Sequence, residues 1–147
     1  MATLTPTLTL ASTDAHSDDI SLSVTKELTI TAPSAGVTRV ATDDNALGDG
    51  AGVLITEAAA TGTTFIYVKH LGILSSDGTT SCHASNDFIT LLNADGDFSI
   101  AKLQPEEFCF LPLSPFDGSD GGVEAGGLKV VAASAAVMIE YGYWTKG

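Results

Sequence analysis

The chain has 147 residues, with 18 acidic and 6 basic side chains and a formal net charge of −12. A chain of this length usually forms one domain with an ordinary core, so it needs no disulfide or metal to fold. Its basic residues are too few and too scattered for a phosphate-binding face, and no apolar run approaches the roughly 18 residues of a membrane span. We therefore expect no nucleic-acid and no membrane partner, and an acidic surface that serves solubility, a basic partner or cation binding.

The first residues, MATLTPTLTLASTD, have no basic region ahead of an apolar core, so we do not expect a signal peptide. The same segment alternates between apolar and threonine side chains, which is the period of a half-buried strand. Leu4, Leu8 and Leu10 share the apolar parity. Pro6 interrupts that parity and removes a backbone donor, which favours a sheet edge. We predict that residues 1–19 form an N-terminal arm that pairs with a neighbouring subunit, or the first edge strand of the chain's own sandwich.

The next segment, DISLSVTKELTIT, keeps its aliphatic side chains on one parity except at Lys26, which marks either a bulge or the end of a strand. Two later segments, FIYVKHLG and FITLLN, are apolar on both parities, as expected of strands covered on both faces. With these two segments included, later strands are expected at residues 37–41, 53–57, 64–71, 88–93, 98–103, 108–113, 128–133 and 137–145. No long window keeps a helical period with caps.

The expected strands number about ten and are separated by turns rich in glycine and aspartate. Many short strands with such turns are typical of all-β proteins. The predicted fold class is an all-β antiparallel β-sandwich or a jelly-roll-like barrel, with residues 20–147 as a single β-sandwich domain.

The segment IAKLQPEEFCFLPLSP has two apolar runs separated by QPEE, and Pro105 presets the backbone for a turn. It is predicted to form a β-hairpin or a corner between two sheets. Pro112 and Pro115 would stop the second strand and protect an exposed edge from further pairing. Of the two parities in FCFLPL, we expect Phe108 and Phe110 to be the more buried pair.

The sequence contains no usable catalytic motif, and its only histidines are His16, His70 and His83. Cys82 is adjacent to His83, but neighbouring residues of a strand point to opposite faces and cannot form a nucleophile–base pair. Cys82 and Cys109 match no metal or redox spacing, so we expect two independent thiols from a reducing compartment. We predict no catalytic residue, no cofactor and no enzymatic activity.

Oxygen-bearing side chains gather at residues 43–49, 93–97 and 117–122. These groups lack the ligand spacing and the flanking helices of an EF-hand, and Asp-Gly pairs are common in hairpin turns. We predict no metal site, with a weak surface Ca²⁺ site as the alternative.

The last expected strand, AVMIEYGYWTKG, carries aromatic side chains on both parities. They either lie at the edge of the core or anchor a contact between subunits, with Trp144 beside Tyr141 or Tyr143, because aromatic residues are enriched at interface centres. The candidate subunit-interface residues are Leu4, Leu8, Leu10, Tyr141, Tyr143 and Trp144.

The order of the segments TTFIYVKHLG, ITLLN, FSIAKLQPEEFCFLPL and GGLKVVAASAAVMIEYGYW resembles small β-sandwich structural proteins of tailed-phage virions. Capsid decoration (cement) proteins and cyanophage-like head proteins are the most similar type, over residues 63–144. Glu106 departs from the pattern, in which glycine is usual at this position. If that glycine serves to adopt a positive φ, the corner in this chain must use another turn type. The matching residues are Tyr67, Val68, Lys69, Leu103, Pro105, Glu107, Phe108, Leu111, Pro112, Glu140 and Tyr141.

The resemblance implies a non-enzymatic virion protein that is made in the host cytoplasm and assembled in many copies on the capsid surface. A decoration protein of this kind would bind the major capsid protein and stabilise its lattice through buried apolar area and added strands. Copies of the chain itself are the other expected partner, and arm exchange would favour a symmetric oligomer such as a trimer. The alternatives are a tail, neck or fibre component and a carbohydrate-binding module, in which Trp144, Tyr141 and Tyr143 would stack on sugars.

Overall fold

The computed structural model describes residues 2–13, 20–40, 53–55, 64–83, 85–93, 98–113 and 128–146. These residues form strands and turns without a helix, and all their sheets are antiparallel, so the all-β prediction is confirmed. The described residues thus include no helix long and apolar enough to cross a membrane. The chain divides into two compact units, one made of Met1–Thr31 with Lys146–Gly147 and the other of Ala32–Thr145.

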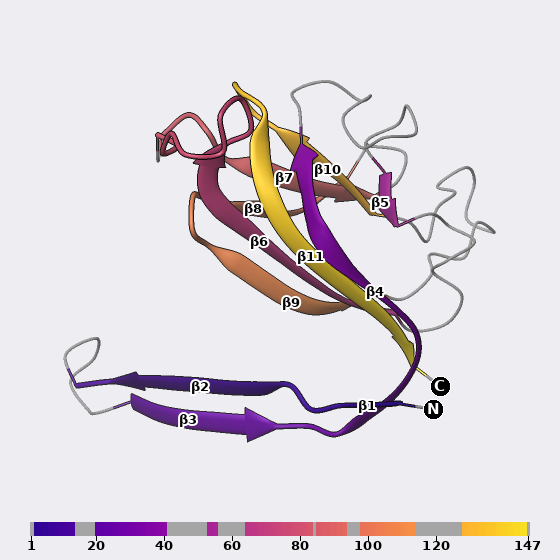
Figure 1. The fold of residues 1–147 in the computed structure, drawn as a ribbon. Helices are drawn as coiled ribbons and strands as arrows, with labels where there is room; N and C mark the ends of the chain where they lie inside the picture. The colour runs from indigo at the N-terminus through magenta and orange to yellow at the C-terminus, as the bar shows by residue number, and fades with distance from the viewer. Residues whose placement is uncertain are drawn as a thin grey trace. The chain divides into compact units, whose positions relative to one another are not determined.

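A two-stranded antiparallel hairpin makes up much of the first unit (Figure 1). β2 (Thr7–Ser12) pairs with β3 (Ile20–Thr25) along the full length of both strands. Within the segment expected as an arm or as the first edge strand of the sandwich, Thr7–Ser12 therefore pairs with the next segment of its own chain. Ala2–Leu4 of the same segment forms the edge strand of the five-stranded sheet. The domain boundary expected after residue 19 falls between β2 and β3, because the sequence period indicates a strand but not its partner.

The first unit also contains β1 (Ala2–Leu4), which pairs with the first residues of β4 (Leu28–Val40). Pro6 lies between β1 and β2, where no sheet hydrogen bond needs its missing N–H. The Lys26 backbone N–H donates to the Pro6 carbonyl at 3.2 Å, so the two interruptions lie opposite each other. Lys26 therefore marks the end of a strand rather than a bulge.

Two antiparallel sheets form the second unit (Figure 1). The β6 sheet has the order β1-β4-β11-β6-β9, in which β1 pairs with the part of β4 in the first unit, and the β7 sheet has the order β5-β10-β7-β8. We call the side of the β6 sheet that faces the β7 sheet its inner face and the opposite side its outer face. The remaining strands are β5 Val53–Ile55, β6 Thr64–Leu74, β7 Ile89–Asn93, β8 Ser99–Leu103, β9 Phe108–Leu113, β10 Leu128–Ala132 and β11 Val137–Lys146.

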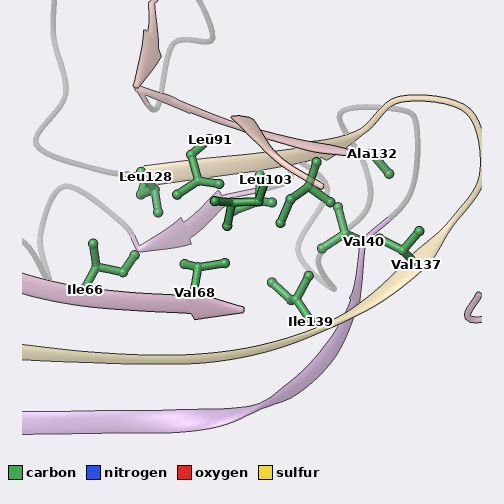
Figure 2. Packing of buried hydrophobic residues seen from close by; sticks show 11 residues of the cluster. Val40, Ile66, Val68, Leu91, Leu103, Leu128, Ala132, Val137 and Ile139 are labelled. Atoms are coloured by element: carbon green, nitrogen blue, oxygen red, sulfur yellow. The ribbon is translucent and has the colours of Figure 1, made fainter. Parts of the chain in front are cut away.

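The hydrophobic core lies between these two sheets, and Figure 2 shows side chains of both layers pointing toward one another. Ile66 and Val68 of β6 and Ile139 of β11 are fully buried on the inner face. Leu91 of β7 and Leu128 of β10 are fully buried opposite them. Because burying a whole aliphatic side chain contributes about 1.5–3 kcal/mol, this cluster holds the two layers together.

The chain turns from one sheet to the other between β8 and β9, so this segment is a corner between sheets rather than a hairpin. The Glu106 backbone N–H donates to the His70 carbonyl at 3.1 Å, and the His70 N–H donates to the Glu107 carbonyl at 2.9 Å. Glu106 has a φ of 72°, the left-handed conformation that glycine adopts most easily. The corner therefore keeps the conformation of a glycine turn although a glutamate stands here.

The register of β9 contradicts the expectation for its two phenylalanines. Cys109 and Leu111 lie on the inner face and pack against the core. Phe108 and Phe110 lie on the outer face, where they are 59% and 38% exposed. Both parities of FCFLPL are apolar, so the sequence period cannot select the buried one, and pairing with β6 decides it.

Candidate functional site

Five aromatic side chains gather on the outer face of the β6 sheet, and we call this group the aromatic face. Its positions follow from strand alternation, because each residue neighbours a side chain on the inner face. In the register, Tyr67 is opposite Phe110 on one side, and Phe65 is opposite Trp144 on the other. The members are Phe65 and Tyr67 of β6, Phe108 and Phe110 of β9, and Trp144 of β11.

The rings of the aromatic face contact one another. Phe65 and Phe110 are stacked, with ring centroids 6.0 Å apart and planes 11° apart. The centroids of Phe110 and Trp144 are 6.4 Å apart, as are those of Tyr67 and Phe108, and both pairs are tilted. Such contacts contribute about 0.5–1.5 kcal/mol each beyond the area they bury. The rings therefore hold one another in place, and the surface needs little ordering when it binds a partner.

Gly142 provides the space that the Trp144 ring occupies. A Cβ atom on Gly142 would stand 2.7 Å from Cη2 and 3.0 Å from Cζ2 of Trp144, closer than non-bonded carbons approach. The indole ring thus lies over the backbone of its own strand, two residues back. Glycine is needed at position 142 because the Trp144 ring lies close to the backbone there, and not because of an unusual φ.

Charged side chains border the aromatic face at one end. Lys69 and Glu140 are opposite each other in the register of β6 and β11, and Lys69 is opposite Phe108 on β9. Burial, and to a smaller extent the charge of Glu140, raises the pKa of Tyr67 above its usual value. The Tyr67 phenol therefore stays neutral at physiological pH and offers a hydroxyl within an apolar surface.

The aromatic face is open to solvent, most of all at Phe108 and Phe110. Large exposed apolar patches on soluble proteins mark interaction sites, and aromatic anchors often dominate the binding energy. β9 is the last strand of its sheet, and Pro112 within it lacks the N–H that an added strand would need. The arrangement therefore favours binding through side chains on the outer face rather than through extension of the sheet.

A second polar group surrounds His70, which is fully buried on the inner face of β6. Its Nδ1 accepts a hydrogen bond from the Gly72 N–H at 3.0 Å, so Nε2 carries the proton and donates to the Asp87 carbonyl at 2.6 Å. Burial lowers the pKa of His70. Because backbone groups occupy both ring nitrogens, His70 ties β6 to the segment before β7 and has no nitrogen left for a metal or a reacting proton.

The Asp87 carboxylate organises the same region. It accepts the Ser134 hydroxyl at 2.5 Å and the His83 backbone N–H at 2.7 Å, and these hydrogen bonds hold the pKa of Asp87 below its usual range. The Ser134 hydroxyl therefore donates to a carboxylate, and not to an imidazole that could activate it as a nucleophile. This arrangement positions a loop and does not form a catalytic relay.

Cys82 and Cys109 are both free thiols, and burial is the main cause that raises the pKa of each. A raised pKa keeps a thiol protonated, whereas a nucleophilic cysteine needs a lowered one. Within the described part of the chain, no group of three or more His, Cys, Asp or Glu side chains could hold a metal ion. His16, residues 43–49 and 117–122, and all but the first residue of 93–97 lie outside the described residues.

The structure separates the aromatic residues that the sequence proposed as one contact. Trp144 belongs to the aromatic face, whereas Tyr141 and Tyr143 lie on the other side of β11. Tyr143 packs against the core, and the Tyr141 ring lies beside Gly36, whose Cβ position would be 3.4 Å from the Tyr141 hydroxyl. A contact that pairs Trp144 with either tyrosine is therefore not formed within this sheet, and an interface role for the tyrosines stays a prediction.

The predicted interface leucines lie in the first unit. Leu4 is partly buried in β1, while Leu8 and Leu10 are exposed on β2. Val24 and Leu22 of β3 are directly opposite them in the register. These two residues complete an apolar surface that the sequence analysis assigned to a separate strand.

Four members of the aromatic face were not among the candidate interface residues, namely Phe65, Tyr67, Phe108 and Phe110. A signal for them exists in the sequence, because FIY and FCF each place two aromatic side chains on one parity of a strand. That these two pairs are neighbours follows only from the pairing of β6 with β9.

Comparison of the chain with protein-family models, with curated proteins and with solved structures finds no match.

Proposed function

We propose that the chain is a non-enzymatic structural protein of a tailed-phage virion, a capsid decoration protein that contacts other virion proteins through its aromatic face. The observation that carries this proposal is a group of five aromatic residues on one face of the β6 sheet, which make three ring contacts and expose Phe108 and Phe110. Exposed apolar surface of this kind is typical of protein contacts. The resemblance of residues 63–144 to phage structural proteins supports the virion as the place of that contact.

In this function, binding depends on removing the aromatic rings from water. Apolar burial contributes about 25 cal/mol per Å², and rings that are already held in place lose little entropy on binding. The net charge of −12 adds long-range attraction to a basic partner surface. A protein made in the host cytoplasm and bound in many copies across the capsid would then stabilise the lattice of the major capsid protein.

Quantitative mass spectrometry of purified particles of the phage that encodes this chain tests the assignment. A decoration protein should be present in a copy number comparable to that of the major capsid protein. A copy number far below this would instead indicate the alternative role of a tail, neck or fibre component. Absence from the particle would overturn the virion proposal altogether.

Cosedimentation with capsids that lack the protein tests the surface. Phe110→Ser on the aromatic face should weaken binding, whereas the matched control Phe98→Ser should not. Phe98 is 61% exposed and precedes β8 of the other sheet, so the control removes the same side chain from a surface outside the aromatic face. Equal binding by both variants and the unmodified chain would exclude the aromatic face as the contact.

The same geometry supports a carbohydrate-binding module as a second candidate, because flat aromatic rings also stack on sugar rings. The structure changes the residues involved: Trp144 would act with Phe110 and Tyr67 rather than with Tyr141 and Tyr143. Trp144 is the only tryptophan in the chain, so its fluorescence reports on this surface alone. Saturable changes in its emission on adding oligosaccharides, without capsid binding, would favour this candidate.

A further inference from the structure

A second apolar surface faces solvent on the hairpin of the first unit. Leu8 and Leu10 of β2 are opposite Val24 and Leu22 of β3, and each of these side chains is between 48% and 64% exposed. We call these four residues the aliphatic face. The other parity of both strands consists of threonine, serine and alanine, so the hairpin has one apolar and one mainly hydroxyl-bearing side.

An isolated two-stranded hairpin is only marginally stable in water, and a third layer or a partner surface usually covers its apolar side. Sheet faces that pack on each other lie about 10 Å apart, with side chains of both faces interdigitating. A sheet face with large apolar side chains would cover the aliphatic face in this way.

We propose that the aliphatic face of one copy packs on the aromatic face of a neighbouring copy. This inference rests on the proposed role of the aromatic face as a protein contact, and it names a second copy of the chain as the occupant. Both surfaces are apolar, and the two strands of the hairpin fit within the width of the aromatic face, which spans the three strands β9, β6 and β11. The aliphatic side chains of the hairpin bring no polar group of their own to the aromatic rings.

Charge in the sequence also distinguishes the hairpin segment from the outer face of the β6 sheet. The segment that joins β2 to β3 contains Asp14, Asp18 and Asp19 and has no lysine or arginine. The outer face of the β6 sheet carries Lys69 beside the aromatic face and, by strand alternation from the buried Val40, Arg39 on β4. In a chain of net charge −12, this face carries two of the six basic residues, with Glu140 opposite Lys69.

The contact joins two different surfaces, so it is a heterologous, head-to-tail contact. The hairpin and the aromatic face belong to different compact units of the chain. Successive contacts of this kind close into a ring when the rotation permits, and the trimer expected from the sequence is one such ring. The strand exchange expected there is replaced by packing of side chains from a complete hairpin.

The expected affinity of a single contact is modest. Four aliphatic side chains form a small surface beside the roughly 800 Å² per partner that a standard interface buries. We therefore expect association that depends on protein concentration, with a dissociation constant of about micromolar order. Ring closure or binding to a lattice would raise the occupancy by making later contacts intramolecular.

Sedimentation velocity of the full chain over a concentration series tests the inference, with Trp144 emission measured in parallel. We expect the mass to rise with concentration and the emission to shift to the blue as aliphatic side chains replace water around the indole. Leu10→Ser with Leu22→Ser on the hairpin should remove both effects, and Phe110→Ser should prevent assembly. Loss of one such side chain should weaken the contact about tenfold.

Two controls accompany these variants. Thr9→Ala changes the hydroxyl side of β2, and Phe98→Ser removes an exposed aromatic ring outside the aromatic face, so both should assemble as the unmodified chain does. Circular-dichroism melts should show that every variant keeps its fold, because all the substituted side chains are exposed.

Mixing the variants distinguishes this contact from packing of hairpin on hairpin. The Phe110→Ser chain retains an intact aliphatic face, and the Leu10→Ser, Leu22→Ser chain retains an intact aromatic face. An equimolar mixture should therefore form a one-to-one heterodimer, although neither variant associates alone. A contact between two hairpins would give no heterodimer.

Two outcomes of sedimentation would overturn the inference: a monomer at every concentration, or an oligomer that persists in both variants. A third would be blue-shifted Trp144 emission in the monomer, with the blue shift lost in the Leu10→Ser, Leu22→Ser variant. The last outcome would mean that a chain covers its own aromatic face. A chain that stays monomeric yet binds capsids through Phe110 would contradict this inference and leave the proposed function standing. A chain that assembles as described but is absent from virions would contradict the proposed function and leave this inference standing.

Discussion

The two faces of the β6 sheet are both apolar, yet they differ in what covers them. Ile66, Val68 and Ile139 on the inner face are fully buried against the β7 sheet. Phe108 and Phe110 on the outer face are larger but remain exposed, with neighbouring rings beside them. Side-chain hydrophobicity therefore does not determine which side of a strand becomes core. The position of the second layer determines it, and apolar surface on the other side is left for binding.

The sharpest test of this difference compares Leu91→Ala with Phe108→Ala. Leu91 is fully buried, so its truncation should lower the free energy of unfolding by about 2–5 kcal/mol through lost transfer energy and a cavity. Phe108 is 59% exposed, and its truncation should cost less than about 1.5 kcal/mol, chiefly the contact with Tyr67. Urea unfolding measures both values. A larger cost at Phe108 than at Leu91 would reverse the assignment of inner and outer faces.

A second test uses His70, the buried polar residue of the inner face. Its pKa is lowered on folding, so the unfolded chain, with a histidine pKa of about 6.5, binds the proton more readily. The contribution of neutral His70 is therefore complete above about pH 6.5 and is lost as the pH falls toward the folded-state pKa, by up to about 1.4 kcal/mol per pH unit. Asp87, whose pKa is also lowered, loses its contribution only at more acid pH.

Urea unfolding between about pH 7.5 and pH 5 checks this slope. His70→Gln should be less stable at neutral pH, because the Gly72 and Asp87 backbone groups lose their partner, but its stability should change less over the window. His83→Gln serves as the control, since the His83 side chain is exposed and its hydrogen bond to Asp87 comes from the backbone N–H. An unchanged slope in His70→Gln would show that another group titrates.

A third test concerns left-handed residues in the segments that join strands. Gly78 has a φ of 67° with open space around a Cβ position, so Gly78→Ala should cost about 1 kcal/mol through backbone strain alone. Glu106→Gly should act in the opposite direction and stabilise the chain by about 0.5 kcal/mol, since relief of strain exceeds the added entropy of the unfolded state. Thermal melts of both variants provide the measurement. Destabilisation by Glu106→Gly would mean that the glutamate side chain itself holds the corner.

The smallest effect on stability is expected on the outer face itself, at Gly142. An alanine Cβ would displace the partly exposed indole of Trp144, which can move toward solvent, so the free energy of unfolding should change by less than about 1 kcal/mol. Trp144 emission should nevertheless shift to the red, and association should weaken. A large loss of stability without an emission change would place the strain in the backbone instead.

The sequence was a good guide to local structure and a poor one to the site. Alternation and turn residues predicted strands at 64–71 and 108–113, where the structure has Thr64–Leu74 and Phe108–Leu113. The same alternation left both parities of FCFLPL apolar, and the wrong one was assigned to the core. Trp144 lies on the other parity of its strand from Tyr141 and Tyr143, yet it was expected to form one contact with them. Its true neighbour, Phe110, lies 34 positions earlier in the sequence, a separation that local patterns do not span.

What the sequence determined by itself is the all-β class, an interruption of the pattern at Lys26 and the two-sided character of each strand. These properties depend on a residue and its near neighbours, through backbone preferences and the two-residue period. The tertiary structure alone decided that β2 pairs with β3, that Glu106 keeps a left-handed turn, and that the phenylalanines of β9 face outward. Each of these depends on which strands pair and which layer covers them. The free energy of burying an apolar side chain depends on the area removed from water and not on which residues cover it. A local sequence pattern therefore does not specify which strand covers a given side chain.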